Sequence, residues 1–207
     1  MRVSRAGQVP ALLACALILA PIAKSQKAAP VLTTLYSFGG TSDGADPETP
    51  LVFGRGGVLY GTTRQQGSAL YGTAFSLSPP ASPGGSWTET TIHTFGEVSG
   101  DGLTPFSGLT AGKGGVLYRV TIQGGPPGDS GTVYSLIPPA TAGGAWTENV
   151  QYGFPYILFG PKGFNPVGSL AIGPDGTLYG ENSAGGANGI RNRLFTKSAG
   201  RPRRVMD

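Results

Sequence analysis

The strongest constraint on the fold of this chain is a tandem repeat, with two long copies of one pattern followed by the beginning of a third. A repeat of this length makes each copy one structural unit, which buries its apolar face against the neighbouring copies. It predicts an architecture without identifying a reaction. The matching runs of the first and second copies are Thr34–Phe38 and Thr91–Phe95, Val58–Gly61 and Val116–Arg119, Gly72–Leu77 and Gly131–Leu136, Pro79–Pro80 and Pro138–Pro139, and Gly84–Glu89 and Gly143–Glu148.

The first copy contains four segments with the composition of β-strands. Pro50–Phe53 and Val58–Thr63 flank a glycine-rich turn and predict a hairpin, in which a glycine pair supplies positive φ angles. Gly72–Ser78 predicts a third strand, which ends at two prolines because proline cannot donate to a β-ladder. Trp87–Phe95 predicts the fourth strand. The unit is therefore expected to be a four-stranded antiparallel sheet.

The second copy fills the same positions, and the third fills some of them. The expected segments are Phe106–Leu109, Val116–Ile122, Gly131–Leu136 and Trp146–Tyr152 in the second copy, and Pro166–Ile172 and Thr177–Gly180 in the third. Four short strands per unit at this spacing are typical of propeller blades. We expect an all-β, β-propeller-like array of four-stranded antiparallel blades over residues 32–190, incomplete at about two and a half repeats (34–91, 92–150 and 151–190). The early segment Thr33–Phe38 is expected to supply the last strand of a preceding or ring-closing blade.

The charge distribution excludes one class of partner. The sequence pI is about 9.3, but most basic residues lie near the two ends of the chain. From Ala28 to Ile190 there are five basic and ten acidic residues. The repeat body is net negative and lacks the basic stripe that a nucleic-acid backbone requires, so we expect no nucleic-acid partner.

The N-terminal segment has the pattern of an export signal over residues 1–25. Arg2 and Arg5 supply a positive region, Ala11–Ala20 is apolar but too short to span a bilayer, and Ala20–Ser25 is a plausible cleavage zone. Cys15 also fits a bacterial lipoprotein box, but the apolar run continues after it. We expect a secreted or cell-surface protein, periplasmic or extracellular, without a transmembrane span and without a disulfide.

These motifs together resemble a known family. Leu59–Thr63, Gly72–Leu77, Gly84–Thr90 and the Phe-Gly, Asp-Gly and Pro residues of the connection are similar to the GloVer-type tandem repeat of secreted bacterial proteins with varied C-terminal anchors (the choice-of-anchor repeat family). The resemblance covers roughly residues 32–189. It implies export and a β-propeller-like array, and it brings no catalytic residues with it. Arg119-Val120-Thr121 departs from the Gly-Thr-Thr of the first copy, and Gly153–Gly163 is a looser version of the connection.

The pattern breaks after Gly189. The repeat predicts a strand resembling Tyr71–Ser76, whereas the chain continues with Ile190–Lys197 and a basic tail over 191–207. One permitted set of codons for Ile190–Thr196, read one base later, encodes Tyr-Gly-Thr-Val-Phe-Ser. We hypothesise a frameshift near Gly189; the alternative is a natural arginine-rich tail that binds an acidic surface. Exposed blade edges predict marginal stability or self-association.

No residue is assigned to a catalytic, cofactor-binding or metal site. His93 is the only histidine and is expected to pack at a position that is tyrosine in the other copies. Glu89 and Glu148 are interpreted as solvated strand positions rather than a catalytic pair. The tyrosines and tryptophans of the repeat are expected to pack between blades rather than bind sugar. The loop carboxylates are interpreted as turn formers rather than calcium ligands; they are Asp43, Asp46, Glu48, Asp101 and Asp129.

The functional expectation is an exported, non-enzymatic β-repeat scaffold for cell-surface or extracellular interaction with a protein or a glycan, belonging to a larger propeller. Two alternatives stay open. One is a glycan-binding module. The other is a propeller hydrolase or lyase, because Ile172–Tyr179 resembles a strand-turn-strand of streptogramin lyase blades. Catalytic propellers use residues that break the repeat symmetry, and among the candidates only His93 does so.

Overall fold

The computed structural model describes residues 29–156, 163–184 and 193–197, the last as the backbone of a strand. Thr34 begins a compact unit that contains all the strands; of the preceding unit, Met1–Thr33, only residues 29–33 are described. The predicted signal segment 1–25 and most of the tail 191–207 lie outside the described residues. Among those described, regular structure consists of antiparallel strands and two short 3-10 turns, so the all-β prediction is confirmed.

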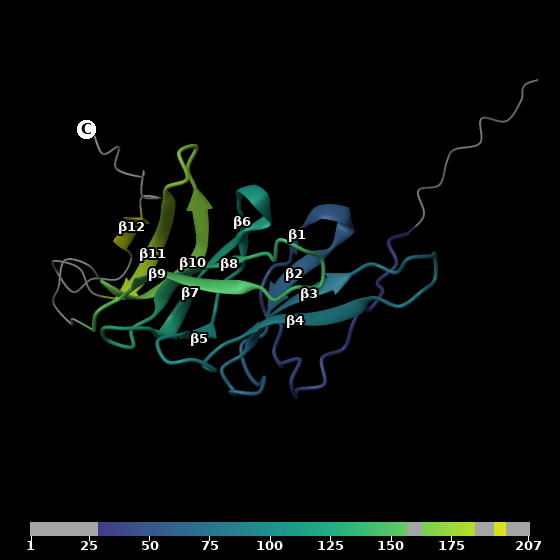
Figure 1. The fold of residues 1–207 in the computed structure, drawn as a ribbon, viewed down its shortest axis with the longest axis horizontal. Coiled ribbons are helices and arrows are strands. Elements are labelled where there is room, and N and C mark those ends of the chain that lie inside the picture. Colours follow the sequence, from purple (N-terminus) through teal and green to yellow (C-terminus); the bar gives the residue numbers. More distant parts are fainter. Residues whose placement is uncertain (1–28, 157–162, 185–192, 198–207) are drawn as a thin grey trace, which may run out of the picture. The chain divides into compact units, whose positions relative to one another are not determined.

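The first sheet contains the four strands predicted for the first copy, in the order β1-β2-β3-β4 (Figure 1). Its strands are β1 (Val52–Phe53), β2 (Leu59–Thr62), β3 (Thr73–Ser78) and β4 (Thr88–Thr94). The turn between β1 and β2 has Gly56 at φ 65° and Gly57 at φ 79°. These angles are in the region that glycine adopts without a Cβ clash, so the predicted glycine turn is confirmed.

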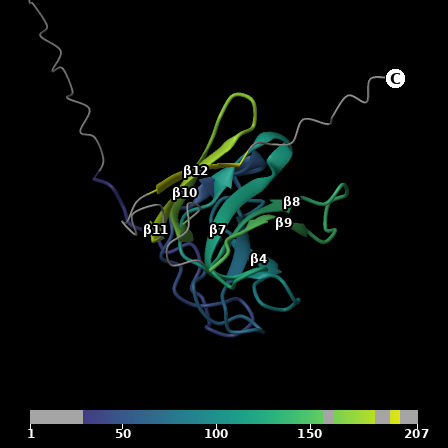
Figure 2. The same cartoon turned by 90° about the vertical axis from the view of Figure 1, so that its left-hand side faces the viewer.

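The second sheet repeats this plan with one strand more. Its strands are β5 (Gly102–Pro105), β6 (Thr110–Ala111), β7 (Leu117–Gly124), β8 (Thr132–Ile137) and β9 (Thr147–Gly153). β7, β8 and β9 lie side by side in Figure 2, and both β5 and β6 pair with β7.

One predicted strand of the second copy is wrong. Phe106–Leu109 falls in the interruption between β5 and β6. Thr104 has φ 55° and is followed by a proline, which ends the ladder there. The apolar character of Phe106–Leu109 has another origin, because Leu109 packs into a hydrophobic core without belonging to a strand.

The third sheet contains β10 (Phe164–Ile172), β11 (Leu178–Ala184) and β12 (Arg193–Lys197), in that order. β10 and β11 confirm the two strands predicted for the third copy. Gly180 of β11 pairs with Phe195 of β12, as Gly61 of β2 pairs with Phe75 of β3. The backbone of residues 193–197 therefore occupies the third-strand position. The frameshift is a statement about the gene and stays a prediction.

The early segment is a second correction. Residues 33–38 were expected to form a strand, but they have no regular secondary structure, since none of the described strands pairs with them. Tyr36 and Phe38 nevertheless pack against the first core cluster, which is formed by Leu59, Phe75 and Leu77. The segment provides the apolar contacts expected of a last strand without its ladder.

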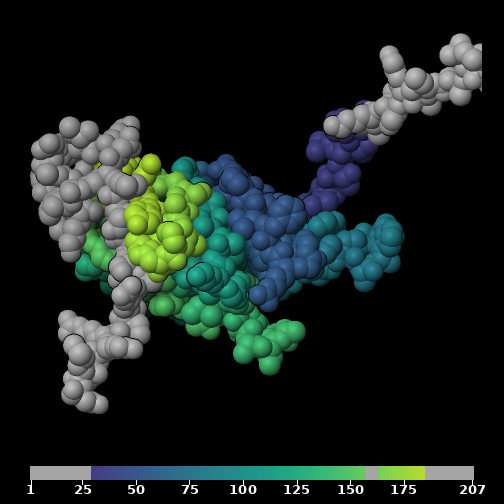
Figure 3. Space-filling view, turned by 90° about the horizontal axis from the view of Figure 1, so that it is seen from above, coloured from purple at the N-terminus to yellow at the C-terminus, as the bar shows by residue number. Residues whose placement is uncertain are grey.

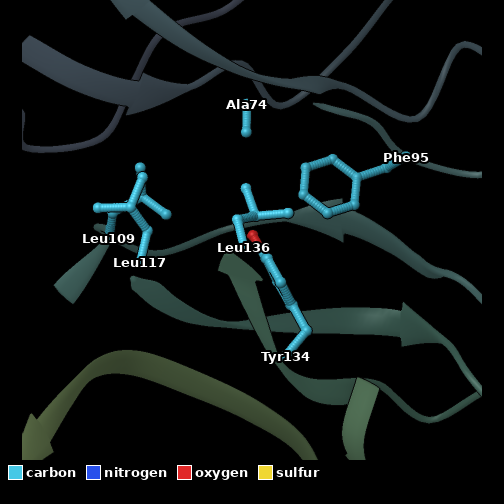
Figure 4. Close-up of a cluster of buried hydrophobic side chains, with 6 residues drawn as sticks. All are labelled: Ala74, Phe95, Leu109, Leu117, Tyr134 and Leu136. Carbon is cyan, nitrogen blue, oxygen red and sulfur yellow. The ribbon is translucent and has the colours of Figure 1, made fainter. Parts of the chain in front are cut away.

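Successive sheets meet through repeat-equivalent residues. Leu117, Tyr134 and Leu136 of the second sheet take the positions of Leu59, Phe75 and Leu77, and they form the second core cluster with Ala74 of β3, Phe95 and Leu109. Figure 4 shows Ala74 facing Leu136, with the ring of Phe95 beside it. Val133, at the position of Ala74, joins the third cluster with Leu170 and Leu178 of the third sheet. The hairpin connections at residues 79–87 and 138–146 project from the surface as two arms, blue-teal and green in Figure 3.

Candidate functional site

Two equivalent polar clusters lie where the chain leaves one repeat and enters the next. The first contains Tyr36, Asp43 and Glu89, and the second contains His93, Asp101 and Glu148 at the matching positions of the pattern. In both, the aspartate belongs to the connection that enters the sheet and the glutamate follows the tryptophan on the last strand. The clusters differ in one residue type, since histidine replaces tyrosine.

The first cluster is closed by hydrogen bonds to Asp43. The Tyr36 hydroxyl donates to Oδ2 of Asp43 at 3.1 Å, and the Gly39 N–H donates to the same oxygen at 2.7 Å. The Thr41 N–H donates to Oδ1 at 3.2 Å. The Gly39 hydrogen bond is the main reason why the pKa of Asp43 lies below its usual range. Both carboxylate oxygens therefore have donors in their own loop.

The second cluster keeps one of these loop contacts. The Gly96 N–H donates to Oδ2 of Asp101 at 2.7 Å, as Gly39 does to Asp43. Nε2 of His93 lies 3.3 Å from Oδ2 and 3.4 Å from Oδ1 of Asp101. The loop is one residue longer here, with Gly96 five residues before its acceptor instead of four. In the part of the chain that the structure describes, no backbone N–H donates to Oδ1 of Asp101.

Glu148 approaches this pair from β9 of the next sheet. The side chain of Asp101 is fully buried, and Oε1 of Glu148 is buried without a hydrogen-bond partner among the described residues. Burial, and secondly the negative charge of Asp101, raise the pKa of Glu148 to about 8. One ligand atom from each of His93, Asp101 and Glu148 lies within 4.8 Å of the others.

The structure changes the interpretation of these residues. The packing role expected for His93 is present, since its ring meets Phe95 edge to face at 4.7 Å between centroids. The turn role expected for Asp101 is also present, in the Gly96 hydrogen bond. Glu148 is not the solvated residue that was predicted, because the strand lies against the preceding repeat. Glu89 and Glu148 are in different clusters.

The other loop carboxylates do not gather. Glu48 pairs with Arg64 at 3.7 Å between Oε2 and a guanidinium nitrogen. Asp46 and Asp129 have positive φ angles of 59° and 51°, which fits their predicted turn role. Within residues 29–156 and 163–184, the group formed by His93, Asp101 and Glu148 is the one whose spacing suits a metal ion.

A buried arginine was missed by the sequence interpretation. Arg119 on β7 is fully buried, and one of its terminal nitrogens donates to the Thr62 hydroxyl of the first sheet. Burial lowers the pKa of Arg119 to about 10, while Tyr134 opposite it on β8 acts in the other direction. Nε and the second terminal nitrogen have no hydrogen-bond partner among the described residues. The signal was the departure from Gly61, which identified the position but not the burial.

Three of the repeated aromatic residues, Tyr60, Tyr118 and Trp146, pack between sheets as expected. Tyr60 meets Trp146 with ring centroids 5.5 Å apart, and both contact the second core cluster. Trp87 packs on the first core cluster, and Tyr118 packs on the third core cluster. Tyr179 is more open, with 37% of its surface exposed.

An open groove of about 460 Å³ runs between the β1–β2 and β6–β7 turns. Phe53, Arg55, Tyr60 and Pro139 are among its lining residues. Phe53 is 76% exposed, so its ring is available to a ligand.

The antiparallel sheets and the equivalent clusters at their junctions define a tandem-repeat all-β protein. The sequence matches the family described as Gloeobacter/Verrucomicrobia repeat over residues 22–195, and the chain belongs to this family. No curated protein matches it. In the described part of the chain, no helix has the length and apolar character needed to cross a membrane.

Proposed function

We propose that this protein is an exported, non-enzymatic β-repeat scaffold that interacts with a protein or a glycan at the cell surface or outside the cell. The supporting observation is the equivalent packing at successive junctions, where the same positions of each copy join one sheet to the next. Such an array is built for surface area rather than for one reaction. A propeller-like arrangement with further blades is part of this proposal, because sheets that stack through one repeated interface can continue and close.

Export is supported by the pattern of residues 1–25 and is tested in the full chain. We expect expression in a Gram-negative host to give a periplasmic product whose N-terminus, read by sequencing, falls after a residue between 20 and 25. Leu13→Arg, which places a charge in the apolar run, is the matched control and should retain the precursor in the cytoplasm. A wild-type chain that stays cytoplasmic with its N-terminus intact would contradict export.

Binding of a glycan is the more specific candidate, favoured by the exposed Phe53 in the groove beside Tyr60. Aromatic rings offer apolar faces on which sugar rings stack. The probes are immobilised cellulose, chitin and peptidoglycan. If one is bound, Phe53→Ala should weaken retention at least tenfold, whereas Tyr156→Ala, an aromatic residue that is 61% exposed outside this groove, should not. Equal losses in both variants would point to nonspecific adsorption.

The enzymatic alternative, a hydrolase or lyase of the streptogramin lyase type, now has one observation in its favour, since His93 is beside two carboxyl groups. If the chain turns over a test ester or lactone, His93→Tyr decides the matter. Loss of turnover with the fold retained would support an enzyme in which His93 is the base, and unchanged turnover would exclude it.

Self-association through exposed sheet edges is the remaining part of the proposal. Light scattering during size-exclusion chromatography of the full chain should give a mass above that of the monomer at high protein concentration. A monomer at every concentration, with one sharp unfolding transition, would contradict it.

A further inference from the structure

The replacement of Tyr36 by His93 changes what its cluster can hold. A tyrosine hydroxyl donates its proton to Asp43 and completes that cluster. A neutral imidazole instead offers a nitrogen lone pair, which is a good ligand for zinc and similar ions. One histidine alone does not form a zinc site, but carboxylate oxygens also bind this ion, and the fold places Asp101 and Glu148 beside His93.

We propose that His93, Asp101 and Glu148 form a binding site for a divalent transition-metal ion of the zinc type, located at the junction of the first and second repeats. Donor atoms that bind zinc tetrahedrally at about 2.0–2.1 Å stand about 3.3 Å apart. Nε2 of His93 and Oδ2 of Asp101 are separated by 3.3 Å. Glu148 completes a set of ligand atoms within 4.8 Å of one another. A fourth ligand position is left for water or an external ligand.

Two unsatisfied oxygens support this assignment independently. Oε1 of Glu148 is buried and no donor reaches it among the described residues, while the carboxyl, when protonated, forms a side-chain hydrogen bond with Asp101. The Tyr134 hydroxyl, on a fully buried side chain, also has no hydrogen-bond partner among the described residues. The charges of Arg119, Glu148 and Asp101 all act on this hydroxyl, so it lies near the second cluster as well as near the buried guanidinium. Buried polar atoms of this kind require a partner such as an ion with its bound water.

The equivalent cluster explains why one site is expected rather than two. Oδ1 and Oδ2 of Asp43 both accept loop N–H groups, and the Tyr36 hydroxyl is bound to Oδ2. Oδ1 of Asp101 has no loop N–H donor among the described residues and faces the histidine. The histidine nitrogen also selects the metal, because calcium and magnesium prefer all-oxygen ligand sets with six or more positions.

The test uses the untagged full chain with Cys15→Ser, which removes the sole thiol. Titration calorimetry with Zn²⁺ should give one ion per chain, and Co²⁺ should give visible absorption bands of a four- or five-coordinate site. Glu148→Gln and His93→Tyr should each weaken Zn²⁺ binding at least tenfold. Glu89→Gln, the same change in the first cluster, should leave it unchanged.

Circular dichroism and urea unfolding establish whether each variant is folded. The site is supported if the two second-cluster variants lose binding while remaining folded. It is overturned if the parent chain does not bind Zn²⁺, if Glu89→Gln and Glu148→Gln have equal effects, or if Ca²⁺ binds as tightly as Zn²⁺. If His93→Tyr fails to fold, the Glu89 and Glu148 pair alone decides. None of these results depends on export or on a scaffold role.

Discussion

The two polar clusters show how one repeat pattern gives different chemistry in successive copies. In the first cluster hydrogen bonds from the loop and Tyr36 satisfy the aspartate, and in the second cluster one aspartate oxygen has no loop N–H donor among the described residues. Tyr36 donates a hydrogen bond to Asp43 in the first copy, whereas in the second copy His93, Asp101 and Glu148 form a group whose spacing suits a metal ion. The surroundings differ as well. Phe38 is partly buried at the outer side of the first sheet, and its equivalent Phe95 is fully buried between two sheets. The change from tyrosine to histidine alters the chemistry of the second cluster because this cluster is largely buried between two sheets and shielded from water.

The largest expected difference between the copies concerns these phenylalanines. Phe95→Ala should lower the free energy of unfolding by about 3–5 kcal/mol, because it leaves a cavity in the core shared by two sheets. Phe38→Ala should lower it by about 1–2 kcal/mol, since the half-buried ring loses less surface. Urea unfolding followed by tryptophan fluorescence measures both. Equal effects would show that the two junctions are not distinguished by burial.

Arg119 provides a second comparison, with Gly61. A side chain at Gly61 would place its Cβ 2.5 Å from the Phe75 ring, so the first copy has no room for one. In the second copy Arg119 is accommodated between sheets and is held by the Thr62 hydroxyl. Arg119→Met keeps much of the volume without the buried charge and should stabilise the fold by about 1–3 kcal/mol.

The partner of Arg119 supplies the control for this prediction. Thr62→Val removes a hydrogen-bond acceptor and should destabilise the protein by about 1–3 kcal/mol, because the guanidinium stays buried. In the Arg119→Met background the same Thr62→Val change should cost much less. Additive effects in this double-mutant cycle would show that the two side chains do not interact.

The next effect depends on pH and compares Glu148 with Glu89. The pKa of Glu148 in the metal-free protein is about 8, above its ordinary value of 4.5. The folded state therefore keeps a proton that the unfolded state loses, and stability falls as the pH rises from about 4.5 to 8. Burial is the main cause of the raised pKa, followed by the negative charge of Asp101 and a side-chain hydrogen bond to it. His93 also faces Glu148, and the buried Tyr134 hydroxyl lies on the same sheet.

Glu148→Gln should remove this pH dependence and, with a chelator present, stabilise the protein at pH 8 by about 1–2 kcal/mol, after allowance for partial exposure. Burial also raises the pKa of Glu89, but less than that of Glu148. Glu89→Gln should therefore change the pH dependence of stability less than Glu148→Gln does. Urea midpoints between pH 5 and 8.5 measure both. A parent protein whose stability does not fall over this range would contradict the protonated state of Glu148.

Much of the fold could be predicted from the sequence because its signals are local: alternating apolar and polar residues, glycine-rich turns, and prolines that end strands. The strands of the first copy were found within about two residues. The break between β5 and β6 could not be predicted, because it depends on the positive φ of Thr104 and not on hydropathy. Residues 33–38 resemble a strand, yet a strand requires a hydrogen-bonding neighbour that hydropathy does not reveal.

The candidate site was less predictable. His93 was identified as a departure from the pattern, but its partners lie 8 and 55 residues away, on a loop and on another sheet. Asp101 and Glu148 recur in the first copy, and recurrence favoured a structural interpretation for each. Only the stacking of the two sheets brings them to His93. Comparing the two copies could have suggested a metal site, because a histidine at one position of a repeated cluster adds a ligand beside the carboxylates that recur in both copies.

The smallest expected effect concerns Asp43, whose pKa is lowered chiefly by the Gly39 N–H. The carboxylate stabilises the fold above its unfolded pKa, and this contribution is lost as the pH falls through the folded value. Asp43→Asn should therefore cost only about 0.5 kcal/mol at pH 7, after allowance for solvent screening of this mostly exposed group, because a neutral amide accepts these hydrogen bonds less well. Near pH 2 it should cost almost nothing. Thermal unfolding at the two pH values measures the difference. The first cluster holds its aspartate ionised through loop N–H groups, so the effect should depend on pH. An effect of equal size at both pH values would show that Asp43 acts through the shape of the loop alone. The difference between Asp43 and Glu148 would then come from packing rather than from charge.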